Sequence, residues 1–134
     1  MEKLRVAVIG TGHLGSFHTK VYSRLDNLKL VGVCDCNLER VIEIGKKYHT
    51  ASFSDYEDLF DQVEAVSIAV PTSLHYNIAK DFLKHDIHVL IEKPVTKTLS
   101  EADELIEIAE KNKLIIQVGH IERFNSAVLA IEPY

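Results

Sequence analysis

Short apolar runs of strand length alternate along the chain with stretches in which apolar residues recur every three or four positions. The first pattern is typical of buried strands, and the second of helices that turn one side toward a sheet. Strands separated by helices form βαβ units, so the fold class predicted is α/β, a doubly wound parallel sheet with helices on both faces. The six expected strands cover residues 4–9, 29–34, 50–53, 65–70, 88–91 and 114–118.

The helical stretches between these strands carry recognisable end signals and apolar faces. Asn37, Ser73 and Ser100 each precede such a stretch and are expected to be N-caps, the last within a capping box that ends at Asp103. In the first helix one apolar stripe is expected, formed by Leu14, Phe17, Val21 and Leu25. The helix after Asn37 is expected to turn four residues toward the sheet: Leu38, Val41, Ile42 and Gly45.

Length and composition fit one domain of ordinary globular type. The chain has 134 residues, 46% of them hydrophobic and 26% charged, with a net charge of −5. That charge argues against a nucleic-acid partner, and apolar runs no longer than a strand argue against a membrane span. Because the chain enters its first strand at once, no signal peptide is expected and a cytoplasmic location is inferred. Cys34 and Cys36 are interpreted as free thiols in a reducing compartment rather than as a zinc site or a disulfide.

A glycine loop joins the first strand to the first helix. Its glycines follow the pattern Gly10-x-Gly12-x-x-Gly15, with Thr11, His13 and Leu14 between them. In such a loop the first glycine permits a tight turn, the second lets the backbone approach a pyrophosphate, and the third lets the helix pack closely on the strand. The start of the helix offers free N–H groups to phosphates. These six residues therefore predict a dinucleotide site of the Rossmann type.

An acidic residue at the end of the second strand bears on the choice of cofactor. Asp35 follows Gly15 by 20 positions. A carboxylate there can accept hydrogen bonds from both hydroxyls of the adenosine ribose, and it repels a 2′-phosphate. This favours NAD over NADP, although Arg40, one turn into the next helix, would weaken the preference. The alternative interpretation is that Asp35 only caps that helix.

Further motifs follow the later strands. They are Pro71-Thr72-x-x-His75 and Glu92-Lys93-Pro94. With the glycine loop and Asp35, they make the chain resemble the N-terminal NAD-binding domain of the Gfo/Idh/MocA oxidoreductases. The resemblance implies that Lys93 is catalytic, lying beside the nicotinamide and hydrogen-bonded to the sugar hydroxyl that is oxidised. It implies that Glu92 lies near the nicotinamide ribose, and that Pro71, Thr72 and His75 wall the cofactor.

The chemistry of these residues is consistent with that role. Oxidation of a carbinol carbon removes the hydroxyl proton, and a nearby ammonium group stabilises the developing alkoxide. From its position alone, however, Lys93 could equally be a solvated lysine after a strand. The Lys93–Pro94 peptide bond is expected to be cis. Four other histidines, His18, His49, His85 and His88, show no metal-ligand spacing; they are expected at the surface or at strand ends, and no metal is expected.

The segment from Val118 to Asn125 carries a narrower resemblance. It is similar to the UDP-N-acetylglucosamine 3-dehydrogenase branch of the family, with Ser126 where that branch usually has proline. The resemblance implies that His120 and Arg123 face the substrate, although Arg123 is equally interpreted as a surface arginine. It also implies that residues 1–120 form the cofactor domain and residues 121–134 begin a second domain. In the family that second domain holds most of the substrate pocket and commonly the dimer interface, so a homo-oligomer is expected of the full-length protein.

The expected function is that of an NAD-dependent oxidoreductase module. It would take a hydride from a hydroxyl carbon of a sugar or nucleotide sugar, with the 3-hydroxyl of a UDP-N-acetylhexosamine favoured. Without a second domain, these 134 residues are expected to bind the cofactor and not to turn over sugar. Two alternatives remain: a dehydrogenase of a free cyclitol or monosaccharide, and a non-catalytic sensor that only binds NAD(H).

Overall fold

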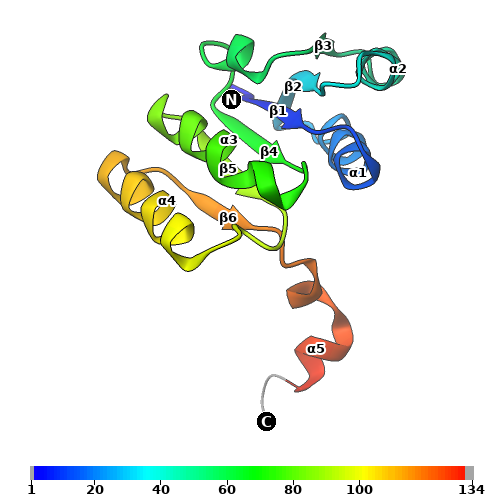
Figure 1. The fold of residues 1–134 in the computed structure, drawn as a ribbon. Coiled ribbons are helices and arrows are strands. Elements are labelled where there is room, and N and C mark those ends of the chain that lie inside the picture. Colours follow the sequence, from blue (N-terminus) through cyan, green and yellow to red (C-terminus); the bar gives the residue numbers. More distant parts are fainter. Residues whose placement is uncertain (1, 132–134) are drawn as a thin grey trace.

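The structure, a computed structural model, describes residues 2–131 and contains one six-stranded parallel sheet (Figure 1). The strand order is β3-β2-β1-β4-β5-β6, so the chain reverses its direction of winding between β1 and β4. This is the order of a doubly wound dinucleotide-binding fold, and it confirms the predicted fold class. The strands are β1 (Leu4–Ile9), β2 (Leu28–Cys34), β3 (Ala51–Phe53), β4 (Ala65–Ile68), β5 (His88–Ile91) and β6 (Ile116–Val118).

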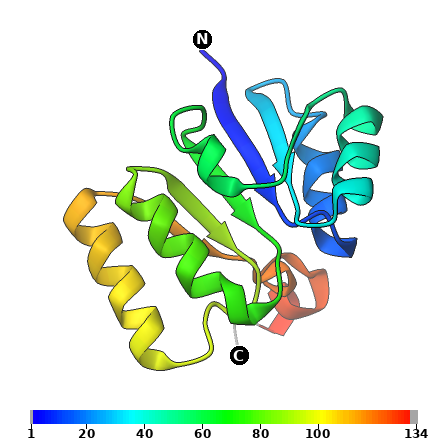
Figure 2. The same ribbon diagram turned by 45° about the horizontal axis from the view of Figure 1, so that its top comes forward.

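Helices cover both faces of this sheet. Figure 2 shows α1 and α2 on one face and α3 and α4 on the other. The α-helices are α1 (His13–Tyr22), α2 (Leu38–Tyr48), α3 (Thr72–Lys84), α4 (Leu99–Asn112) and α5 (Ser126–Ile131). Two 3₁₀ turns, η1 (Tyr56–Leu59) and η2 (Ile121–Phe124), complete the described chain. Beyond β6, residues 121–131 run away from the sheet (Figure 1).

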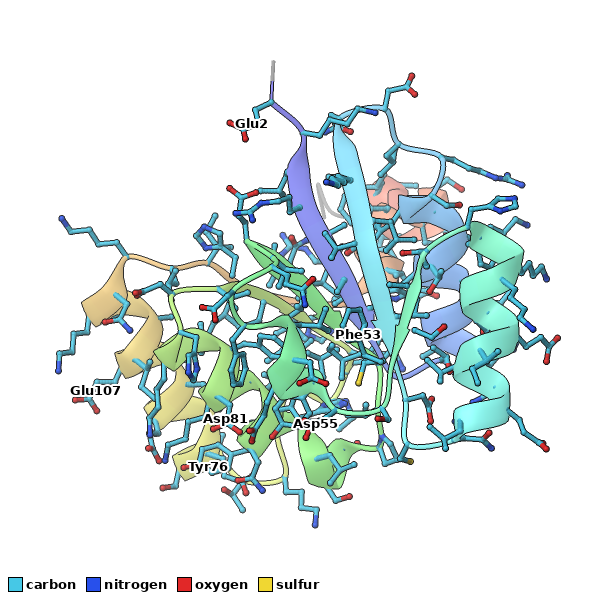
Figure 3. All side chains as sticks on the ribbon, turned by 90° about the horizontal axis from the view of Figure 1, so that it is seen from above. Glu2, Phe53, Asp55, Tyr76, Asp81 and Glu107 are labelled. Carbon is cyan, nitrogen blue, oxygen red and sulfur yellow. The ribbon has the colours of Figure 1, made fainter. Side chains whose placement is uncertain are left out.

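Two apolar cores result, one on each face. Alternate residues of a strand point to opposite faces, so Ala7 and Ile9 of β1 join the core under α3 and α4, whereas Val8 joins the core under α2. The larger core includes Phe82 and Leu83 of α3, both fully buried. The segment after β3 is joined to α3, on the side of the larger core, because the Tyr56 hydroxyl donates to Asp81 at 2.8 Å. Asp55, the N-cap of η1, and Asp81 lie on this same side of the sheet (Figure 3).

Helix α2 faces the sheet with a narrower set of residues than its sequence pattern suggests. Val41, Ile44 and Gly45 are buried, but Leu38 and Ile42 are 57% and 45% exposed, so their predicted inward orientation was wrong. The cause is the close approach of α2 to β3, where a Cβ on Gly45 would lie 2.1 Å from Ser52 Oγ. Because of that approach, the side of α2 that carries Gly45 faces the sheet, and Leu38 and Ile42 lie at the exposed side of the helix.

The three predicted caps had different outcomes. Asn37 caps α2 as expected, its side chain accepting a hydrogen bond from the backbone N–H of Arg40 at 3.0 Å. Ser73 is not a cap, because α3 already begins at Thr72, directly after Pro71. Ser100 is not a cap either: Thr98 and Glu101 form the capping box of α4, which starts before Ser100.

Helix α1 packs on the sheet through small residues. Its fully buried positions are Gly15 and Thr19. The predicted apolar stripe lies on the outer side instead: Leu14, Phe17 and Val21 are 46%, 51% and 52% exposed, and Leu25 lies beyond the helix end. Small inward residues bring α1 close to β1 and β4, and this closeness matters for the site described below. Within residues 2–131, no helix combines the length and apolar character needed to cross a membrane.

Candidate cofactor and substrate site

The carboxyl ends of the parallel strands bring the predicted residues to one edge of the sheet. Backbone hydrogen bonds continue the strand ladder past the strand ends there, from Gly10 N–H to Cys34 O at 2.8 Å, and from Glu92 N–H to Ile68 O at 3.0 Å. The loops at this edge therefore start from fixed positions. In open α/β sheets, ligands bind at this edge, in the crevice where the winding reverses. Here the crevice lies between the loops after β1 and β4.

The glycine loop has the geometry that its sequence predicts. Gly10 has φ +91°, and a Cβ there would lie 2.4 Å from Ala69 O. A Cβ on Gly15 would lie 1.8 Å from Gly10 O, so only glycine allows α1 to start this close to the turn. By contrast, a Cβ on Gly12 would meet no atom within 4 Å. The protein's own packing therefore does not require glycine at position 12, but a pyrophosphate against the loop does.

The N-terminus of α1 is open toward this space. Its N-cap is Gly12, and no side chain accepts hydrogen bonds from its first turn. The first N–H groups of a helix have no partner within the helix, and together with the helix dipole they favour an anion. His13 begins the helix, is exposed, and contacts Phe17 edge-on with ring centroids 5.0 Å apart. The loop and the helix start thus fit the pyrophosphate of a dinucleotide.

Asp35 is held beside the glycine loop and is nearly buried. Thr11 donates to Asp35 Oδ2 twice, from its backbone N–H at 2.7 Å and from its hydroxyl at 2.9 Å. Asn37 N–H donates to Asp35 Oδ1 at 2.9 Å, and the cap of α2 is Asn37 itself. Burial alone would raise the pKa of Asp35, but the hydrogen bonds from Asn37, Thr11 and Arg40 outweigh it and lower the pKa to about 2.

Arg40 occupies the outer side of this carboxylate. Its Nη2 lies 2.8 Å from Asp35 Oδ2 and 3.0 Å from Oδ1, while the side chain remains 46% exposed. A ribose diol approaching Asp35 meets this guanidinium first. Arg40, together with Thr11, Gly12 and His13, lines a groove of about 810 Å³ between α1 and α2 that is open at the cofactor edge. The structure therefore places Arg40, which was expected from the sequence to weaken the preference for NAD, directly on the carboxylate of the predicted adenosine site.

The charge of Asp35 gives a testable pH dependence. Because its folded-state pKa is depressed from 3.8 to about 2, its stabilising contribution is complete above about pH 5 and is lost as the pH falls toward 2. We expect Asp35→Asn to lower the free energy of unfolding by ~2 kcal/mol at pH 7, and by much less at pH 2 to 3. Urea unfolding of both proteins across this range measures the difference. If the difference in unfolding free energy between the two proteins stays constant with pH, the lowered pKa of Asp35 is contradicted.

At the other end of the edge, Glu92, Lys93 and Pro94 follow β5. The Lys93–Pro94 peptide bond is cis, as predicted, and Lys93 is exposed. Glu92 is only 6% exposed, and its Oε1 lies 2.8 Å from Nε2 of His18 in α1. The expectation that His18 is a surface or strand-end residue was therefore wrong. Its spacing from Gly15 and Tyr22, three and four residues, was the signal that places it on the inner side of α1.

His75 is buried rather than open to the edge. Its ring nitrogens lie 2.9 Å from Pro94 O and 2.8 Å from Val70 O, and the residue is 1% exposed. It thus joins the loop after β4, which carries Pro71 and Thr72, to the loop that carries Lys93. Thr72, half-buried, is the first residue of α3. These two loops form one connected wall at the centre of the edge.

A groove of about 690 Å³ lies below this wall, on the face of β5 and β6 that the helices leave open. Glu92, His18 and Gly119 line one part of it, and His120 and Arg123 line another. The structure therefore brings both predicted substrate residues into the same groove as Glu92. Phe124 and Leu129, which are 80% and 50% exposed, extend the groove as an apolar rim. The part of the chain that the structure describes holds no cluster of three or more metal-binding side chains.

The fold, the open helix N-terminus and the acidic residue after β2 define a dinucleotide-binding domain. A family model described as "Oxidoreductase family, NAD-binding Rossmann fold" matches residues 4–120. The chain belongs to this family, the Gfo/Idh/MocA oxidoreductases, and its domain binds NAD. The predicted family and cofactor are thereby confirmed.

Several relatives are similar over nearly the whole chain. UDP-N-acetylglucosamine 3-dehydrogenase of Acidithiobacillus ferrooxidans is 40% identical over 128 residues, 96% of this chain and 40% of the relative. Inositol 2-dehydrogenase of Rubrobacter xylanophilus is 31% identical over 98% of this chain and 39% of the relative. The chain thus spans about 40% of the length of the curated relatives that it matches.

Solved structures of such relatives have the same fold as this chain. A structure of the Acidithiobacillus ferrooxidans enzyme superposes with a TM-score of 0.92 at 38% identity, covering 99% of this chain and 43% of that one. A protein from gentamicin A biosynthesis, solved in complex with NAD, superposes with a TM-score of 0.86 at 25% identity, covering 89% of this chain and 35% of that one.

Proposed function

We propose that this chain is the cofactor-binding part of a dehydrogenase that oxidises a hydroxyl carbon of a sugar or nucleotide sugar, with the 3-hydroxyl of a UDP-N-acetylhexosamine as the favoured target. The observation that carries the proposal is the combination of an NAD site with a groove that Glu92, His120 and Arg123 line, Lys93 being the next residue after Glu92. The similarity to a UDP-N-acetylglucosamine 3-dehydrogenase over 96% of the chain supports the nucleotide sugar as substrate.

Different residues along the carboxyl edge of the sheet have different roles in binding and catalysis. Gly12 and the start of α1 hold the pyrophosphate, and Asp35 holds the adenosine ribose. NAD, when bound, supplies the acceptor for the hydride. Lys93 lies at the other end, between Glu92, whose N–H donates to Ile68 O, and Pro94, whose carbonyl lies 2.9 Å from a ring nitrogen of His75; there its ammonium group can stabilise an alkoxide on the substrate. His120 and Arg123, on the groove beside it, contact the substrate.

Arg40 bears on the choice between NAD and NADP. A carboxylate at position 35 favours the ribose diol of NAD, so NAD is the cofactor that we propose for the whole enzyme, with NADP less favoured. Yet the guanidinium of Arg40 is half exposed, with Asp35 as its partner among residues 2–131, and a 2′-phosphate would offer it a second anionic partner. Arg40 therefore weakens the preference for NAD over NADP without reversing it.

We further propose that residues 121–134 begin a second domain and that residues 1–120 form the cofactor domain. Large apolar side chains are exposed on η2 and α5, including Ile121, Phe124 and Ile131 at 63%, 80% and 67%. Side chains of this kind are normally covered, and a substrate domain that also forms a homo-oligomer interface would cover them.

The exposed free thiol of Cys36 fits a reducing, cytoplasmic setting.

A ligand panel with an activity assay tests this function. We expect NADH, at hundredfold excess over its Kd, to raise the Tm of the 134-residue chain by roughly 5–10 °C, and NADPH to raise it less. We expect no sustained NADH formation from UDP-N-acetylglucosamine by this chain alone. In an enzyme that contains this domain together with its substrate domain, nucleotide sugars should reduce NAD faster than inositol does. The opposite order would favour a cyclitol dehydrogenase, the activity named for the Rubrobacter relative.

A further inference from the structure

A partly buried histidine connects helix α1 to the reactive end of the site. The His18 side chain is 18% exposed and lies between β4 and the end of β5. Its Nε2 is 2.8 Å from Glu92 Oε1, and its Nδ1 is hydrogen-bonded to the hydroxyl of Ser67 in β4, which is fully buried. Both ring nitrogens are therefore used within the protein, and the ring orientation is fixed by two strands.

The direction of these hydrogen bonds follows from the groups involved. A carboxylate oxygen accepts, so His18 Nε2 donates to Glu92 Oε1. In the tautomer with its proton on Nε2, Nδ1 accepts from the Ser67 hydroxyl. Tyr22 lies one turn further along α1, and its pKa is raised by burial and partly lowered by a hydrogen bond with Ser67. Ser67 thus has two side-chain neighbours on α1, Tyr22 and His18.

The far side of the Glu92 carboxylate is closed by Gly119. A Cβ at position 119 would lie 3.0 Å from all three atoms of that carboxylate group, and Gly119 N–H donates to Ile91 O at 2.8 Å. Glu92 is thus held between α1 and the end of β6. On the other flank of Lys93, His75 holds the carbonyl of Pro94 at 2.9 Å. Lys93 is exposed, yet both of its neighbours in sequence are anchored by a histidine.

We propose that His18 is a positioning residue that sets the nicotinamide end of the site through Glu92. The inference rests on the proposed function, because it requires the nicotinamide to lie beside Glu92 and Lys93. Helix α1 then serves both ends of the cofactor: its N-terminus holds the pyrophosphate, and its second turn fixes the strand end that carries Lys93. The inward glycine and threonine of α1 allow this, since they bring the helix close enough for an imidazole to reach Glu92.

The test compares NADH with ADP-ribose, which has the pyrophosphate and both riboses but no nicotinamide. We expect His18→Leu to weaken NADH binding to the 134-residue chain at least tenfold and to change ADP-ribose binding less than twofold. His18→Gln, whose amide can still donate to Glu92, should restore NADH affinity to within about threefold of the wild type. A purely structural role would weaken both ligands together and would not be rescued in this ligand-specific way.

The outcomes separate the two proposals. If wild-type protein binds neither ligand, the proposed function fails before any variant is compared. If wild-type protein binds NADH no more tightly than ADP-ribose, or if His18→Leu affects both equally, the role of His18 is overturned while the cofactor site stands. Should His18→Leu fail to fold, Glu92→Gln supplies the same comparison, since it keeps the volume of the side chain and removes its charge; unchanged NADH affinity in that variant also overturns the inference.

Discussion

Gly12→Ala is expected to weaken NADH binding at least tenfold while changing the free energy of unfolding by less than about 1 kcal/mol. The added methyl group meets no protein atom within 4 Å, and φ at this position is −67°, which alanine adopts readily. A glycine-to-alanine change stabilises by about 0.4–1 kcal/mol through the unfolded state, and the weaker N-capping by alanine offsets that gain. The methyl group does occupy the space where a pyrophosphate would approach the backbone. Titration calorimetry with NADH and urea unfolding measure the two effects separately.

Gly15→Ala is the matched control, because it adds the same methyl group three residues later. There the methyl carbon would lie 1.8 Å from Gly10 O, a backbone atom that cannot move without opening the turn. We expect a loss of unfolding free energy on the order of 3 kcal/mol or more. The two variants thus separate the effect of a methyl group on ligand binding, at position 12, from its effect on protein packing, at position 15. Equal NADH affinity in Gly12→Ala and wild type would place the pyrophosphate elsewhere.

Lys93→Met is expected to lower kcat by about 10²–10⁴-fold in an enzyme that contains this domain and its substrate domain, with NADH affinity changed less than about threefold. Methionine keeps most of the length of the side chain and removes the ammonium group. Because Lys93 is exposed and follows an anchored glutamate, its loss leaves the glycine loop and Asp35 untouched. Steady-state kinetics with a nucleotide sugar, alongside NADH titration, measure the two quantities.

The same variant decides between an enzyme and a sensor. A protein that only senses NAD(H) has no use for an ammonium group at a substrate hydroxyl, so its ligand response would survive the change and it would have no turnover to lose. Lys97 offers a matched control, since it is an exposed lysine four residues further along the same loop. Lys97→Met should leave kcat within twofold of the wild type. Equal losses in both variants would remove the catalytic role of Lys93.

Strands and glycines were predictable because their signals are local. The β5 strand, for example, was predicted with its observed bounds, 88–91, since a buried strand must be apolar on both faces wherever helices cover it. Gly10 and Gly15 were assigned correctly because a tight turn and a close helix leave no room for a side chain. The cis bond before Pro94 also agreed with its expected place in a tight turn.

The orientation of α1 and the partners of Glu92 were not predictable in the same way. An apolar stripe normally marks the buried side of a helix, but in α1 small residues face the sheet and Phe17 faces outward. That inversion concealed His18, whose partner Glu92 lies 74 positions away in sequence. The pairing of Arg40 with Asp35 was missed for a related reason: spacing showed the two residues to be near, but only the packing of α2 shows that the guanidinium lies on the carboxylate.

Backbone NMR shifts on addition of NADH and of ADP-ribose test most directly whether one cofactor runs from the glycine loop to Lys93. Both ligands are predicted to shift the amides of Gly12, Gly15 and Cys36, next to the pyrophosphate and the adenosine ribose. Only NADH is predicted to shift Lys93 and Gly119 as well. If NADH leaves the glycine loop unchanged, or if the two ligands shift Lys93 and Gly119 alike, the account of a nicotinamide held beside Lys93 is contradicted.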